Sequence, residues 1–205
     1  MTKEIFLDFS DVKNNFDYLV KENENLTLHL LDIYNKNTDN KILIKLKENS
    51  SVKVLLSSFA KKNITKNFLI NFEHLEDNAK STFNSYLIAS HLSKIKVKIV
   101  SDIKPKTTNS KTSQEIKGVL LSNSSLIHGE PQLIIDDNNV KAKHAMAIGK
   151  INPNQIFYLM SRGISEKVAI QLILMGFFNT TLSIIKDKKI WNLYNIKIKK
   201  LFSGK

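Results

Sequence analysis

The sequence predicts a mainly β protein whose C-terminal part is helical. From Leu26 to about Ala142, short apolar runs are broken by polar turns, and near Asn152 the pattern changes to helical spacing. The segment 94–99, Lys-Ile-Lys-Val-Lys-Ile, puts its apolar residues on one face, as a half-buried strand does. With 205 residues, of which 42% are hydrophobic and 24% charged, the chain has the composition of a soluble globular protein.

The strand pattern alone leaves the β architecture open. Short strands that recur about every ten residues suit a sandwich, a barrel or a parallel β-solenoid. The hairpin dipeptides Asn-Gly and Asp-Gly are absent, which disfavours an antiparallel meander. The expected strands include the apolar runs 26–33, 41–46, 52–56, 68–72, 94–100, 119–121 and 132–135. We expect a β core over residues 1–148 and a helical segment over 149–205.

A short helix is expected before this core, over residues 10–20. Ser10 or Asp11 would cap it, and Phe16, Leu19 and Val20 would form its apolar side.

The first C-terminal helix is marked at both ends by its sequence. Asn152 can cap it and Pro153 suits its first position, where the missing N–H costs nothing. Gly163 can end it in the left-handed conformation, with Ile164 folding back as in a Schellman ending. A helix is therefore predicted over residues 153–162.

Two further helices are predicted after it. Ser165 caps the second, whose apolar stripe includes Val168 and Leu172. The third begins near Thr181, after a joint at 179–181, and Trp191, Tyr194, Ile198 and Leu201 keep helical spacing in it. The uncharged stretch 168–185 contains several polar residues, so it indicates protein interior or interface rather than a membrane span.

Composition and motifs argue against an enzyme. The chain has no cysteine, which removes disulfides, thiolate zinc sites, a cysteine nucleophile and a cysteine-held iron–sulfur cluster made by this chain alone. Phosphate-binding glycine loops, His-Glu-x-x-His and Gly-x-Ser-x-Gly are also missing. The N-terminal residues do not form a secretory signal, so a cytoplasmic location is expected.

The net charge of +12 raises nucleic acid as a partner. However, Arg162 is the only arginine, and lysine lacks the guanidinium fork that reads base edges. We therefore expect a solvated lysine surface, with a lysine-rich nucleic-acid-binding β module as the alternative.

The five histidines, at positions 29, 74, 91, 128 and 144, form no catalytic spacing. His29 suits a strand interior, whereas His74, His91 and His128 suit loops or strand ends. His144 differs, because it lies at the join between the β and helical regions among small alanines. From spacing alone, a histidine bonded into that junction is favoured over a metal ligand. For Asp136-Asp137, a turn is favoured over a cation site.

Around this junction the sequence resembles the C-terminal part of the SufB/SufD family, the paired scaffold proteins of iron–sulfur cluster assembly. The resemblance rests on five segments, one of which contains Ser-Arg-Gly-Ile with the sole arginine: 120–122, 130–135, 140–141, 144–149 and 156–165. Ala145, Met146 and Ala147 replace the family's Gly-Ala-Thr. Gly149 and the absence of cysteine favour a SufD-like member over a SufB-like cluster-assembling scaffold, which is the alternative.

The resemblance implies a right-handed parallel β-helix followed by a C-terminal helical segment. It implies a non-catalytic subunit that pairs with a SufB-like partner and docks a SufC-like ABC-type ATPase, while this chain itself binds no nucleotide. Neither nucleic acid nor a membrane is an expected partner. His144 would help to hold iron or a transient cluster at the subunit interface, and no cofactor would be held stably by this chain alone. The expected docking residues, for each of which core packing is the alternative, are Phe157, Tyr158, Arg162, Leu172, Met175, Phe177 and Phe178.

Overall fold

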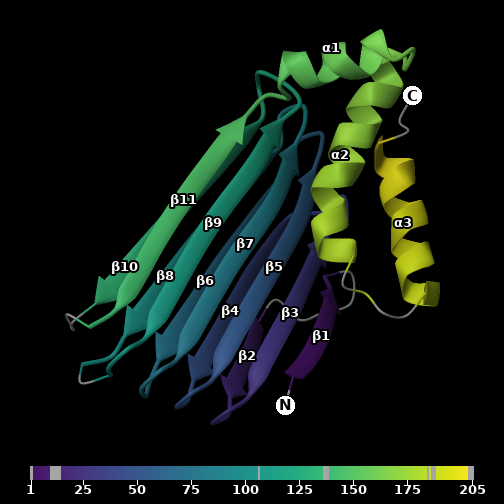
Figure 1. Ribbon diagram of the computed structural model, residues 1–205. Coiled ribbons are helices and arrows are strands. Elements are labelled where there is room, and N and C mark those ends of the chain that lie inside the picture. The colour runs from purple at the N-terminus through teal and green to yellow at the C-terminus, as the bar shows by residue number, and fades with distance from the viewer. Residues whose placement is uncertain are drawn as a thin grey trace. The chain divides into compact units, whose positions relative to one another are not determined.

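The computed structural model describes residues 2–9, 15–105, 107–135, 139–183, 185 and 188–202 (Figure 1). They form two compact units, Met1–Ile148 and Gly149–Lys205. The strands of the first unit are β1 (Thr2–Asp8), β2 (Asn15–Val20), β3 (Asn25–Asp32), β4 (Thr38–Leu46), β5 (Ser51–Ala60), β6 (Thr65–His74), β7 (Lys80–Ala89), β8 (Lys94–Ile103), β9 (Lys111–Leu120), β10 (Leu126–Ile135) and β11 (Lys141–Gly149). The helices of the second are α1 (Pro153–Ser161), α2 (Glu166–Leu182) and α3 (Lys188–Phe202).

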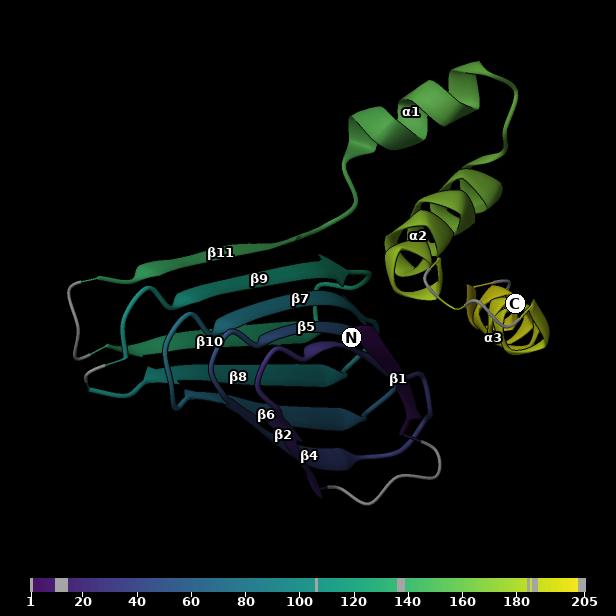
Figure 2. The ribbon, with the colours of Figure 1, turned by 60° about the horizontal axis from the view of Figure 1, so that its bottom comes forward.

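The strands build two parallel sheets. Sheet A has the order β1-β3-β5-β7-β9-β11 and sheet B the order β10-β8-β6-β4-β2. Consecutive strands alternate between the two sheets, so the chain advances by one coil for every two strands (Figure 2). This is a parallel β-solenoid followed by helices, and it confirms the predicted β-helix.

The coils stack in register, which places equivalent residues in columns. One column of sheet A joins Asn25 to Ser51, Ser51 to Lys80 and Lys80 to Lys111. The strands of such a sheet lie about 4.8 Å apart, so each side chain lies directly beside its equivalents. Residues distant in the sequence are therefore grouped by column.

Asparagines make one row of turns between the strands. Asn23, Asn49, Asn78 and Asn109 have φ values of 58°, 54°, 57° and 56°. This left-handed region is costly for most residues with a side chain but is tolerated by asparagine. The Asn109 Nδ2 donates to Asn78 Oδ1 at 2.8 Å, so the turns also bond to one another.

The interior between the sheets is mostly aliphatic and aromatic. Leu28, Val54 and Phe83 follow one another in a single inner column, and each has 0% exposure. Because the column is continuous, each coil covers the apolar face of the one before it.

The prediction of a short helix over residues 10–20 is wrong. Residues Asn15–Val20 form β2 and pair in parallel with β4. Phe16, Tyr18 and Val20 alternate toward the core, which is the period of a strand. Pairing with β4 thus outweighs the local pattern that predicted a helix. The predicted caps, Ser10 and Asp11, lie outside the described residues.

Helix α1 begins and ends where its sequence indicates. The Asn152 Oδ1 accepts a hydrogen bond from the Asn154 N–H at 2.9 Å, and Pro153 takes the first turn. Gly163 has a φ of 83°, and the Ile164 N–H donates to the Leu159 carbonyl at 3.2 Å. These are the two ends of the predicted helix.

The predicted joint at 179–181 is wrong, because α2 continues to Leu182. The Ser183 N–H donates to the Asn179 carbonyl at 2.7 Å, which continues the helical bonding. Asparagine and threonine weaken a helix by only a few tenths of a kcal/mol, and packing between α2 and α3 outweighs this. The Phe178 and Phe202 rings meet edge to face at 5.7 Å, and Gln171 Nε2 donates to the Phe202 carbonyl at 2.9 Å. None of the described helices has both the length and the apolar character of a membrane span.

Candidate functional site

The last coil of the solenoid, made by β10 and β11, is its open end. Each strand is the last of its sheet, and Lys141 to Ala147 are all exposed. A Cβ atom placed on Gly129 of β10 would lie 2.8 Å from the sulfur of Met146. Met146 therefore faces the interior, and strand alternation places Ala142, His144 and Ile148 in the same inner row.

The register of β11 follows from its hydrogen bonds to β9. The Lys141 N–H donates to the Ser110 carbonyl at 3.1 Å. The Lys111 N–H donates in the same way to the Ala79 carbonyl, within the pairing that sets Lys80 beside Lys111. Lys141 thus lies beside Lys111, and three residues further along both strands His144 lies beside Gln114.

His144 occupies the outermost place of an inner column. Its predecessors Leu28, Val54, Phe83 and Gln114 are buried, whereas His144 is exposed. Within the described part of the chain its side chain makes no hydrogen bond, and its row carries alanine and methionine beside it. The structure thus places this imidazole at an accessible face of the β unit, on its inner row.

A chain of polar side chains lies behind His144 in the mostly apolar interior. The Ser81 hydroxyl donates to Thr112 Oγ1 at 2.9 Å, and Thr112 donates to Ser101 Oγ at 2.8 Å. The Gln114 Nε2 donates to Ser101 Oγ at 2.8 Å and to the Gln132 carbonyl at 3.1 Å. This chain joins strands of both sheets next to the open end.

His74 forms the inner end of the same chain. Its Nε2 lies 2.9 Å from Ser81 Oγ, and the ring is buried. Burial penalises the charged imidazolium and lowers the pKa of His74 to about 4. The ring is therefore neutral near pH 7, and because the Ser81 proton points to Thr112, Nε2 carries the hydrogen that Ser81 accepts.

The other histidines are scattered, as the sequence indicates. His29 lies inside β3, His74 ends β6, and His91 lies in a turn with a φ of 57°. His128 lies inside β10 rather than at a strand end. Over the described ranges, no three histidine, aspartate or glutamate side chains are grouped so that they could hold a metal ion. Asp136 and Asp137 lie outside the described residues.

The second unit presents several of the expected docking residues. Phe157, Tyr158 and Leu172 are 72%, 58% and 49% exposed. The Arg162 guanidinium lies 5.4 Å from the centre of the Tyr158 ring, which is a cation–π contact. Met175 and Phe177 are half-buried. Phe178 is buried against Phe202 and so belongs to the helical packing.

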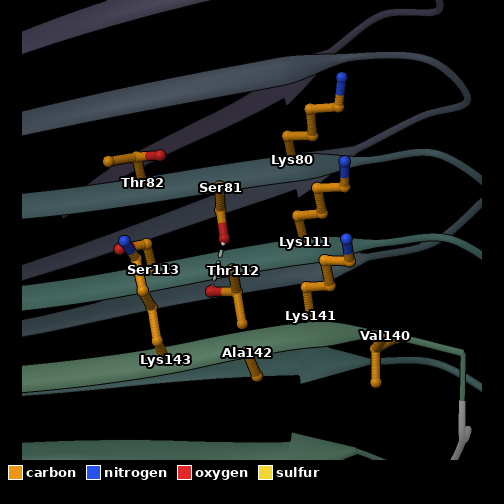
Figure 3. A pocket seen from close by; sticks show the side chains of 10 residues that line it. All are labelled: Lys80, Ser81, Thr82, Lys111, Thr112, Ser113, Val140, Lys141, Ala142 and Lys143. Carbon is orange, nitrogen blue, oxygen red and sulfur yellow. Dashed lines mark hydrogen bonds between the residues drawn. The ribbon is translucent and has the colours of Figure 1, made fainter.

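A lysine ladder, which sequence reasoning missed, runs along the outer face of sheet A. Lys80, Lys111 and Lys141 share one column, and their amines point the same way beside a groove of about 620 Å³ (Figure 3). No ion pair to these three lysines occurs among the described residues, although Lys98 pairs with Glu130 at 2.6 Å on sheet B. The roughly thirty-residue recurrence of lysine was the available signal, and it is visible only once the register is known.

Comparison with known proteins places this geometry in a family. Residues 13–177 match the family model for the SUF system of FeS cluster assembly, SufBD core domain. The chain is 29% identical over 110 residues to the iron–sulfur cluster assembly protein SufD of Bacillus subtilis strain 168, an alignment that covers 54% of this chain and 22% of that protein. It is 32% identical over 104 residues to SufB of the same organism, with 51% and 22% covered.

A third alignment covers fewer residues but has a higher sequence identity. A SufBD family protein of Archaeoglobus fulgidus is 51% identical over 63 residues, which cover 31% of this chain and 17% of that protein. In all three comparisons the matched part spans about a fifth of the relative's length. SufD and SufB resemble the chain to a similar degree.

Proposed function

Because the chain belongs to the SufBD family of iron–sulfur cluster assembly proteins, we propose that it is a SufD-like, non-catalytic scaffold subunit that pairs with a SufB-like subunit. The observation that carries the proposal is the place of His144, on the inner row of the exposed last strand. An inner row at the end of a solenoid is a surface that a further coil or a partner covers.

The two edges of the open end differ in a way that favours pairing at β11. An exposed edge strand offers unpaired backbone groups to another chain. Pro131, in β10, has no N–H to offer, and proline is a common device that blunts an edge. β11 contains no proline and presents a continuous exposed strand. A SufB-like partner that adds its own strand to β11 would extend sheet A.

Iron or a nascent cluster is the substrate of such an interface, and His144 is the ligand that this chain would offer. Neutral imidazole binds iron well, and a site shared by two subunits needs few residues from each. Thiolate ligands would come from the partner, because the 205 residues include no cysteine. The favoured branch is SufD-like for the same reason, since a SufB-like subunit is expected to supply the assembling cysteine.

The helical unit would dock a SufC-like ABC-type ATPase in the cytoplasm. Phe157, Tyr158 and Leu172 supply exposed apolar area of the kind that dominates protein interfaces. ATP hydrolysis would take place in that partner, and the resulting movement would open and close the face that carries His144.

The proposal is tested by co-expression with SufB-like and SufC-like partners. The expected result is a stable complex in which His144→Ala lowers the cluster content, measured by iron and sulfide analysis, while the pull-down composition stays the same. His128→Ala is the matched control, because His128 lies on the exposed outer row of β10 in the same coil. Recovery of the chain alone as a monomer would contradict the pairing, and unchanged cluster content in His144→Ala would remove the ligand role.

A further inference from the structure

We propose that Gln114 positions His144 by accepting a hydrogen bond from the imidazole, so that the other ring nitrogen faces out of the open end. The proposal rests on the proposed ligand role of His144 and names the residue that orients it. It is carried by a buried acceptor without a partner, which lies beside His144 in the same inner column.

The orientation of the Gln114 amide is fixed by its neighbours. The Gln132 backbone carbonyl can only accept, so the group 3.1 Å from it is the amide nitrogen. The same nitrogen donates to Ser101 Oγ at 2.8 Å, which uses the second N–H. The amide oxygen is therefore held on the opposite side of the group and can only accept.

That oxygen has no hydrogen-bond partner in the part of the chain that the structure describes. Gln114 is 1% exposed, and its Oε1 is closed to solvent. Buried polar atoms are almost always bonded, because an unsatisfied acceptor loses its hydration without compensation. A donor is thus expected close to Gln114 Oε1.

The imidazole of His144 can supply this donor. It occupies the next place in the column, about 4.8 Å away from strand to strand. Two residues further along the row, Met146 has no N–H or O–H to donate, and Ala142 has no polar group. The imidazole is exposed, so a change of rotamer needs no movement of the backbone, and such a change would bring one N–H to the Gln114 oxygen.

This bond would set both the tautomer and the direction of the ring. With one nitrogen protonated and held by Gln114, the other presents its lone pair to the outside. Histidines that bind metal generally donate their second ring nitrogen to an acceptor in this way, and removal of that acceptor weakens metal binding about 10- to 100-fold.

The test follows the tautomer of His144 in the full chain by two-bond ¹H–¹⁵N correlation of its ring nitrogens. We expect one dominant tautomer in the wild type and a mixture of both in Gln114→Met, which keeps the side-chain length but removes the acceptor. Gln114→Glu keeps an acceptor and should restore the hydrogen on the facing nitrogen. Ser101→Ala is the matched control, because it breaks the same polar chain behind Gln114 and should leave the tautomer unchanged.

Iron binding by the co-purified complex supplies the second readout. Gln114→Met should weaken Fe²⁺ binding about 10- to 100-fold, whereas Ser101→Ala should not. An unchanged tautomer in Gln114→Met, or an equal shift in Ser101→Ala, would overturn the positioning role. Loss of the ligand role is a separate outcome, since it appears as unchanged cluster content in His144→Ala.

Discussion

The closed middle coils and the open end of the solenoid use the same inner columns for different purposes. In the middle, Leu28, Val54 and Phe83 fill a column with 0% exposure. At the end, the same column continues into the polar Gln114 and the exposed His144. A column that is continuous in geometry therefore changes in chemistry as it nears the surface that a partner would cover. The middle stabilises the fold, whereas the end is available for recognition.

Two buried polar groups, one in each region, differ in their pairing. In the middle, the Lys66 ammonium is fully buried and lies 2.5 Å from Asp32 Oδ1. Thr38 also donates to Asp32, at 3.0 Å, so this buried charge is enclosed by partners. Near the open end, the Gln114 oxygen has no such partner among the described residues. Within the described ranges, unpaired buried hydroxyls also occur in the middle coils, at Ser58 and Ser85, so the contrast concerns these two groups and not every polar group of each region.

The largest effect that tests this comparison is the truncation of an inner residue. Phe83→Ala should lower the free energy of unfolding by about 3–5 kcal/mol, because it leaves a cavity between packed coils. Met146→Ala, on the inner row of the last strand with 55% exposure, should cost less than about 1 kcal/mol. Urea unfolding of both variants measures the difference. Equal losses would mean that the open end is as tightly packed as the middle.

The next largest effect is the pH dependence that the buried His74 gives to the free energy of unfolding. In the unfolded chain His74 titrates near its ordinary pKa of 6.5, whereas in the folded protein the pKa is lowered to about 4. The unfolded state therefore binds more protons between these values, and this contribution to stability is full above pH 6.5 and is lost as the pH falls to about 4. The loss amounts to about 3 kcal/mol.

One substitution separates His74 from the other titrating groups. His74→Gln should remove that part of the pH dependence in urea unfolding at pH 7 and pH 4.5. An unchanged profile in His74→Gln would mean that other groups carry this pH dependence.

Glycine substitutions compare packing in the interior of the last coil with packing at the end of its last strand. A Cβ on Gly129 would lie 2.7 Å from Ile116 and 2.8 Å from Met146, so Gly129→Ala should cost about 1–3 kcal/mol through overpacking. Gly149 has no atom within 4 Å of such a Cβ, so Gly149→Ala should be nearly neutral. Thermal unfolding checks both. A neutral Gly129→Ala would show that Met146 moves aside freely.

The sequence predicts those parts of the fold that depend on local chemistry. Asn152, Pro153 and Gly163 fixed α1, because caps act within a few residues. The strand at 94–99 was visible because its inner row is wholly apolar. Strand β7 was not singled out, because Ser81 and Ser85 interrupt the apolar pattern of its inner row. Strand β2 was predicted as a helix, because its strand conformation depends on pairing with β4, which lies further along the sequence.

The candidate site was predictable only in part, for the same reason. His144 stood out by its position at the junction, but Gln114 carried no local signal. Its importance comes from the register between β9 and β11 and from the two acceptors, Ser101 Oγ and the Gln132 carbonyl, that orient its amide. The lysine ladder likewise becomes apparent only when the register between neighbouring strands of sheet A is known. Which residues of neighbouring coils share a column cannot be predicted from the spacing of residues in the sequence until the number of residues in each coil is known.

The smallest expected effect concerns charge on the two outer faces. Lys111 lies between Lys80 and Lys141, and like charges in neighbouring strands are destabilising. Lys111→Gln should therefore raise the free energy of unfolding by about 0.2–1 kcal/mol at low salt, an increase that fades as salt screens the exposed charges. Lys98→Gln is the control of opposite sign, because it breaks the pair with Glu130 and should slightly lower stability. If both variants changed stability in the same direction, the ladder would not be a region of uncompensated charge.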